Sequence, residues 1–181
     1  INSAFLPGIL LDSIDISGWS FNNCNFKYSS FIGSNCENTK FLENTDLSDS
    51  SFHDSKLNYV KFEMTKLKST NFNKASMKDA LFSDIIESEK TKFQGSKLHR
   101  AKFRNSVILE GQFQGAFASE VDFHKCTMYR SKFTSAEIVD STFKICKLNG
   151  ARLDSVKAHQ SKFYNTTIIG ARMDHANFVG S

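Results

Sequence analysis

Residues 52–82 read FHDSKLNYVKFEMTKLKSTNFNKASMKDALF, and a phenylalanine returns at every tenth position of this stretch. An aliphatic or thioether side chain stands halfway between successive phenylalanines, at Leu57, Leu67 and Met77. The hydrophobic pattern therefore has a period of five. Neither an α-helix, with a period of 3.6, nor a β-strand, with a period of two, explains this spacing. A fixed short repeat has to be interpreted before any other signal, because it decides the architecture.

The same repeat continues along most of the chain. Further phenylalanines keep the ten-residue spacing: Phe93, Phe103, Phe113, Phe123, Phe133, Phe143 and, two steps on, Phe163. Two positions before a central residue the side chain is small or β-branched, as at Thr65, Ser96 and Ala101. We expect the central and the small residue to point inward and the other three to face water. Each five-residue unit then forms one side of a square coil, and four units complete the coil.

Stacking of such coils places equivalent residues in columns. Neighbouring coils should lie about 4.8 Å apart, the usual spacing of hydrogen-bonded strands. One column is expected to contain Phe31, Phe52, Phe72, Phe93, Phe113, Phe133, Leu153 and Met173. The opposite column is expected to contain Phe21, Phe41, Phe62, Phe82, Phe103, Phe123, Phe143 and Phe163. From Ile16 to Phe178 there is room for about eight coils, so we predict an all-β quadrilateral rod roughly 40 Å long.

The register of the repeat slips by one residue at two places. The step from Phe41 to Leu47 has six residues in place of five, and the step from Phe82 to Phe93 has eleven in place of ten. The phenylalanine phase is kept after both slips. We therefore predict a one-residue bulge at a corner of the coil in each case, the second one within residues 85–90.

The repeat resembles that of the pentapeptide-repeat family, whose units read roughly Ala-Asp/Asn-Leu/Phe-X-X. The units that match best are Ala75-Ser76-Met77, Ala101-Lys102-Phe103, Ala151-Arg152-Leu153, Ala171-Arg172-Met173 and Ala176-Asn177-Phe178. The resemblance covers about nine tenths of the chain and implies a right-handed quadrilateral β-helix. This sequence differs from the family pattern at the position before the centre, which is often Lys or Arg here instead of Asp or Asn.

We expect a single domain. Residues 16–181 are predicted to form the β-helix, and residues 1–15, which include the apolar stretch 5–11, to cover its first coil. The chain starts at Ile1 and the repeat is still running at Ser181, so we interpret it as a fragment of a longer protein. No apolar run is long enough to span a bilayer, and no signal peptide is evident.

The residue types that carry catalytic or metal chemistry do not occur at the spacings typical of an active site or a metal site. The four cysteines fall at inward positions, Cys24, Cys126 and Cys146 at the small one and Cys36 at a centre. Stacking of Cys126 on Cys146 leaves a disulfide or metal pair as an alternative, but we interpret the thiols as small apolar fillers that stay reduced. The histidines are scattered, and no nucleotide-binding or nucleophile motif occurs. We therefore expect no enzyme activity, cofactor, metal or small-molecule substrate in this segment.

Some outward positions of the repeat are apolar. Val107, Leu109, Tyr129 and Ile169 fall on one side of the predicted rod, and Arg130 follows Tyr129. A row of apolar side chains across several coils is typical of a protein-interaction surface, whereas single exposed apolar residues need no explanation. These five residues form our candidate interaction surface, with chance scatter as the alternative.

A second candidate is a basic ladder, formed by Lys92, Lys132, Arg152 and Arg172 on another side of the rod. These residues either keep the strand faces soluble or bind an acidic partner. The net charge is only +4, and acidic residues are interspersed with the basic ones. This balance argues against nucleic acid as the partner and leaves a membrane surface as a weaker alternative to protein.

The sequence thus favours a non-catalytic scaffold for protein interaction or substrate recognition. The family resemblance implies two settings for it. One is a bacterial effector delivered into the host cytosol by type III secretion. Some of these effectors look like HECT-type ubiquitin ligases with an N-terminal β-helix. If this chain belonged to such a ligase, the catalytic cysteine would lie beyond Ser181. The other is a dimeric, gyrase-binding DNA mimic of the quinolone-resistance type, which requires an acidic surface. The Ser/Asn/Lys-rich repeat favours the effector, and a purely structural rod is a third alternative.

Overall fold

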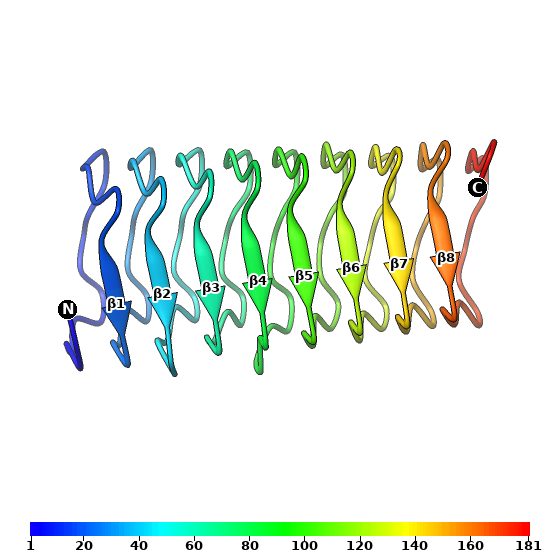
Figure 1. Ribbon diagram of the computed structural model, residues 1–181. Helices are drawn as coiled ribbons and strands as arrows, with labels where there is room; N and C mark the ends of the chain where they lie inside the picture. Colours follow the sequence, from blue (N-terminus) through cyan, green and yellow to red (C-terminus); the bar gives the residue numbers. More distant parts are fainter.

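The computed structural model describes residues 1–181 as a rod of stacked coils (Figure 1). Its strands are β1 (Ser20–Asn22), β2 (Lys40–Leu42), β3 (Lys61–Glu63), β4 (Leu81–Ser83), β5 (Lys102–Arg104), β6 (Asp122–His124), β7 (Thr142–Lys144) and β8 (Lys162–Tyr164). They form one parallel sheet in sequence order, and the two termini lie at opposite ends of the rod. The secondary structure includes no helix with the length and hydrophobicity of a membrane span.

Four backbone ladders run along the rod. The β1–β8 sheet is one of them, and rows of single parallel bridges form the other three, which include Asn25 on Asp46, Ser30 on Ser51, and Asn35 on Lys56. Four ladders per coil confirm the predicted quadrilateral solenoid. Seven successive strand pairings connect β1 to β8, so seven turns separate these strands, and further coil residues flank them on both sides.

The two predicted phenylalanine columns fill the centre of the rod. Phe103 stacks on Phe82 with ring centroids 4.6 Å apart and on Phe123 at 4.8 Å, and its side chain is completely buried. The opposite column meets it edge-on, as where Phe113 lies 6.1 Å from Phe103 at an interplanar angle of 79°. Both offset-stacked and edge-to-face pairs are favourable ring arrangements. The sequence-derived register is therefore correct for both columns.

Most hydroxyls at the small inward positions donate to backbone carbonyls; the buried Thr65 hydroxyl, which has no partner, is an exception. The Thr70 hydroxyl donates to the Leu47 carbonyl of the preceding coil at 2.8 Å, and the Ser131 hydroxyl donates to the Ile108 carbonyl at 3.0 Å. A buried hydroxyl that finds an acceptor carries little penalty. Serine and threonine can therefore occupy this position as well as alanine, which has no polar side-chain group that needs a hydrogen-bond partner.

All four cysteines are buried free thiols, as predicted from their inward positions. The Cys126 sulfur lies 3.4 Å from the Phe103 carbonyl, and the Cys146 sulfur takes the same place one coil later, 3.3 Å from the Phe123 carbonyl. Burial raises the pKa of the Cys36 thiol to about 12. All four thiols pack as small side chains in the core, and Cys36 in particular is poorly placed to ionise and react.

The two register slips have different structures. Between Leu42 and Thr45 the corner contains two residues of positive φ, Glu43 and Asn44, so the extra residue sits at a corner as predicted. The second slip lies within residues 85–90 as predicted, but the extra residue is on a side of the coil and not at a corner. Asp84 keeps the corner, Ile85 points into the core, and the extra residue Ile86 is pushed out to solvent on the following side.

A size exchange within the core explains the second bulge. Ser88 occupies a central position where the adjacent coils carry Leu67 and Ile108, and it is buried. Ile85 is large where the neighbouring coils carry Thr65 and Ser106. A close-packed core loses stability if a void is left, so the large Ile85 compensates for the short Ser88. Inserting Ile86 between them keeps both Ile85 and Ser88 on the inward side.

The ladders extend further toward the N-terminus than the expected start at Ile16. Single bridges join Asn2, Phe5, Leu10 and Asp15 to the residues of the next coil. The residues in phase with the inward positions of this first coil are spaced by five: Ile1, Leu6, Leu11 and Ile16. Ile1 and Leu6 remain exposed at this end of the rod. The outward positions are also apolar, since Phe5 and Leu10 are both exposed, and this hides the repeat from a search for apolar periodicity.

Replacement of a central ring should destabilise the whole rod. We expect Phe103→Ala to lower the free energy of unfolding by about 3–5 kcal/mol, because the ring is fully buried between two stacked neighbours. Chemical denaturation of the two proteins measures this loss. The matched control is Phe117→Ala, which removes an exposed ring and should change stability by only about 0.5 kcal/mol. Equal losses in the two variants would contradict the core register.

Candidate interaction face

The second bulge interrupts one of the four ladders. The ladder runs through Asn25, Asp46, Lys66 and Glu87, and then resumes from Val107 through Thr127, Lys147 and Thr167, with no bridge between Glu87 and Val107. The Val107 amide instead donates to the Ile85 carbonyl at 3.1 Å. The other three ladders have no such gap between β1 and β8. Bulges of this kind bend the chain locally and re-aim side chains, and they are common beside functional sites.

Two adjoining hollows lie at the interruption. The first has a volume of about 240 Å³ and is lined by Lys68, Ile86, Glu87, Ser88, Glu89, Val107 and Leu109. The second has a volume of about 260 Å³ and is lined by Glu89, Leu109, Glu110, Tyr129 and Arg130. Glu89 and Leu109 belong to both linings, so the two hollows lie next to each other on one side of the rod. We call them together the bulge groove.

The groove is lined by apolar side chains together with charged ones. Ile86 is half-exposed, and Val107, Leu109 and Tyr129 are each partly accessible. Three glutamates surround these side chains, and each has a basic neighbour: Glu87 with Lys66 at 3.1 Å, Glu89 with Lys90 at 3.4 Å, and Glu110 with Arg130 at 3.9 Å. The hydrogen bond and charge of Glu87 raise the pKa of the Lys66 ammonium. These pairs are open to water, so each contributes little stability and leaves the carboxylates available.

The structure brings most of the candidate interaction surface together. Val107, Leu109, Tyr129 and Arg130 all line the bulge groove. Ile169 lies on the same side but two coils beyond Tyr129, with Asn149 between them, and it is largely exposed. Ile86 and Glu89 also line the groove but were not predicted from the sequence to belong to this surface. Their signal was the eleven-residue step after Phe82, which we interpreted only as a corner bulge.

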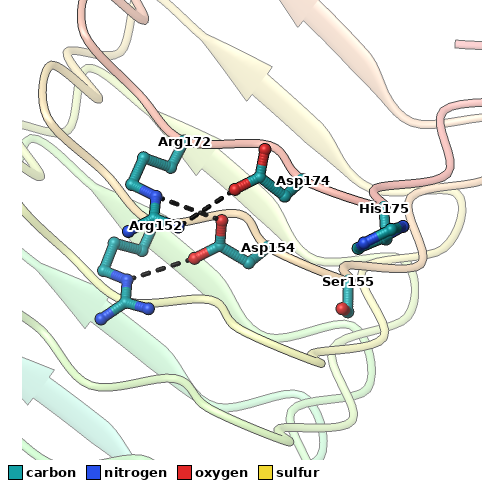
Figure 2. A pocket seen from close by; sticks show the side chains of 6 residues that line it. All are labelled: Arg152, Asp154, Ser155, Arg172, Asp174 and His175. Carbon is teal, nitrogen blue, oxygen red and sulfur yellow. Dashed lines mark hydrogen bonds and ion pairs between the residues drawn. The ribbon is translucent and has the colours of Figure 1, made fainter.

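The basic ladder exists as a row, but acidic side chains neutralise its C-terminal end. Parallel bridges join Lys92, Gln112, Lys132, Arg152 and Arg172 in this order. Figure 2 shows Asp154 lying against both arginines, 3.2 Å from Arg152 and 3.7 Å from Arg172, and Asp174 paired with Arg172 at 3.0 Å. Asp154 is nearly buried. The hollow here is entirely polar, with Ser155 and His175 completing its lining.

Ionisable side chains elsewhere form surface networks that resemble no reactive site. Arg100 binds Asp79 through two hydrogen bonds of 2.8 and 2.7 Å and donates a third to His99, whose other ring nitrogen lies 2.9 Å from the Ser119 hydroxyl. The structure contains no group of three or more His, Cys, Asp or Glu that could hold a metal ion. Nothing in this geometry indicates a reaction.

Comparison with known proteins identifies the repeat. Residues 45–84 match the family model described as pentapeptide repeats, in eight copies. The structure continues the same ladders on both sides of this segment. The matched pentapeptide repeats are therefore part of one continuous solenoid. No curated protein matches the sequence.

Similar solved structures are also pentapeptide-repeat or resistance proteins, at low identity. A trypsin-treated form of QnrB1, a plasmid-mediated fluoroquinolone resistance protein, is 18% identical over 96% of this chain and 90% of its own, with a TM-score of 0.42. HetL, a pentapeptide-repeat protein involved in heterocyst differentiation regulation in the cyanobacterium Nostoc sp. strain PCC 7120, is 13% identical over 98% and 88%, also with a TM-score of 0.42. No functional argument follows from similarities at this level.

Removal of the buried carboxylate should expose the charge of the basic ladder. We expect Asp154→Asn to elute from heparin at higher salt than the unchanged protein, because Arg152 and Arg172 both lose a partner. The cost in stability should be at most about 1 kcal/mol, since both arginines remain accessible to water. Asp140→Asn makes the same change of charge at an exposed corner and serves as the control. Equal heparin shifts in the two variants would show that only net charge matters.

Proposed function

We propose that this chain is a protein-interaction scaffold that binds its partner in the bulge groove. The observation that carries the proposal is the coincidence of two features. The only interruption of the four ladders between β1 and β8 lies beside the bulge groove, whose lining includes four apolar or aromatic side chains: Ile86, Val107, Leu109 and Tyr129. A rod with flat faces offers few places for a specific contact, and the bulge makes one. The proposal assigns no reaction to this segment.

The groove supplies the side-chain types that anchor protein interfaces. Tyr129 and Arg130 are of the kinds most often found to dominate binding energy, and the half-exposed Ile86 would be removed from water by a partner. Glu89 lines both hollows and is placed to accept a basic group. The occupant we propose is a protein segment that inserts a large apolar side chain next to a lysine or arginine.

The alternative functions find less support in the surface. A gyrase-binding DNA mimic must present carboxylates in place of phosphates, but the chain has a net charge of +4, and Lys40, Lys61 and Lys102 are exposed along the strand face. A purely structural rod gives no reason for an apolar groove. The partial neutralisation of the basic ladder weakens the case for nucleic acid or a membrane surface.

The setting we propose is a bacterial effector delivered into a host cell, in which this rod recognises the partner or substrate. The Ser/Asn/Lys-rich repeat and the reduced thiols support this setting. A translocation reporter fused to the full-length protein should reach the host cytosol only in strains with a working type III secretion apparatus. Equal delivery without the apparatus, or none with it, would contradict the effector setting and leave the groove proposal untouched.

Binding through the groove can be tested with a displayed library of random peptides. Peptides selected on the chain should contain a large apolar residue near Lys or Arg, and Tyr129→Ala with Leu109→Ser should weaken their binding by about tenfold or more. Fluorescence anisotropy of the synthesised peptides measures the change. The double variant should keep the native circular dichroism spectrum, since neither residue belongs to the buried core.

A matched variant on another face provides the control for this experiment. Phe117→Ala with Val139→Ser removes two outward apolar side chains from a side that does not line the groove. Selected peptides should bind this variant normally. Peptides that bind the groove variant as well as the unchanged protein would place the interface elsewhere.

A further inference from the structure

Ile145 occupies a backbone conformation that disfavours its side chain. The corners of the coils are turned by residues of positive φ, mostly Gly, Asn, Asp, Ser or unbranched side chains. Ile145 has a φ of 58° and is the only β-branched residue among them. A β-branched side chain in this region is strained, because its Cβ substituents crowd the backbone. Strain of this kind persists where the surrounding structure imposes it, and it is often found at functional sites.

Burial does not compensate for this strain. The Ile145 side chain is 43% exposed and does not belong to the hydrophobic core. Tyr164 follows it on the next coil, where the Ile145 amide donates to the Tyr164 carbonyl at 2.8 Å, and Tyr164 is 50% exposed. Two large, exposed side chains on adjacent coils thus lie at or next to one corner of the rod.

Lysines surround this pair on three sides. Lys144 precedes Ile145 and lies in register with Tyr164, Lys125 holds the equivalent corner one coil earlier, and Lys147 begins the next side. All three are exposed, and none of them forms an ion pair. The carboxylate of Asp122, on the adjacent strand β6, is bound to Arg104 at 2.6 Å. We call these five residues, Lys125, Lys144, Ile145, Lys147 and Tyr164, the basic corner.

We propose that the basic corner binds an acidic protein segment that carries an apolar side chain between its carboxylates. Unpaired lysines attract carboxylates, and Ile145 with Tyr164 offers an apolar contact in their midst. The strained isoleucine then has a reason to be kept at a position where asparagine or glycine would be more stable. This surface lies nearer the C-terminus than the bulge groove, and the proposal does not depend on the groove.

Two other anionic ligands fit the corner less well. Nucleic acid binding relies on many phosphate contacts along a basic groove and on aromatic stacking platforms, whereas three lysines and one tyrosine span only three coils here. Insertion into a membrane requires more apolar area than two half-exposed side chains provide. A protein segment is the ligand that uses both the charge and the small apolar patch.

The test uses a short fluorescein-labelled peptide in which Asp and Glu alternate with Phe and Leu, and measures binding by anisotropy. The unchanged chain should bind it saturably, and a matched peptide with Lys in place of the acids should not bind. Ile145→Asn should weaken binding by about tenfold, and Lys125→Glu with Lys144→Glu should abolish it. Because asparagine tolerates positive φ, Ile145→Asn should also raise the melting temperature, by roughly 2–4 °C.

The control variant is Met64→Asn, which makes a similar replacement in the same column of corners. Met64 has a φ of 51° and is 45% exposed, but its neighbours Glu63 and Asp84 are acidic. This variant should bind the acidic peptide normally. Equal binding by Ile145→Asn and the unchanged chain would overturn the proposal. So would tighter binding to single-stranded RNA or to phosphatidylserine vesicles than to the acidic peptide.

Discussion

The structure depends on the stacking of each coil on the next at the strand spacing. The backbone ladders set this distance, and it also suits phenylalanine rings in offset-stacked contact, whose centroids lie 4.5–5.4 Å apart along the two columns. The core therefore has little freedom along the rod axis, and a change in side-chain size has to be balanced within its own coil. Ile85 and Ser88 show such a balance. Gly111 shows the limit, because a Cβ there would lie 2.7 Å from the Ile108 side chain and 3.0 Å from the Phe113 ring.

This constraint also decides where specific surfaces can arise. Regular ladders produce flat sides on which residues of successive coils line up, so charged side chains find opposite charges one coil away, as Asp154 does with Arg172. Distinct shape or unbalanced charge needs a departure from the regular pattern. The bulge at Ile86 is a departure in backbone register, and Ile145 is a departure in the choice of corner residue. The two proposed surfaces lie at these two irregularities.

The fold could be predicted from the sequence because one short period governs both the core and the backbone. Phenylalanine spacing alone identified the columns, the coil and the approximate place of each slip. The first coil escaped notice because Phe5 and Leu10 are apolar on the outside, which erases the contrast between inward and outward positions. The position of each residue within the repeat placed Val107, Leu109 and Tyr129 on one side of the rod. It could not reveal the groove, because the position of Ile86 depends on how Ile85 and Ser88 share the interior.

The hydroxyl contacts of the small inward residues give the rod a direction. Apart from Thr65, whose buried hydroxyl has no partner, these donors reach either a carbonyl of their own coil, as Ser55 does with Phe52, or one in the coil before, as Thr70 does with Leu47. None of these hydroxyls donates to the coil that follows. A coil emerging from the ribosome therefore meets its acceptors on a surface that has already been synthesised. Assembly from the N-terminus, one coil at a time, never requires a buried hydroxyl to wait for a partner.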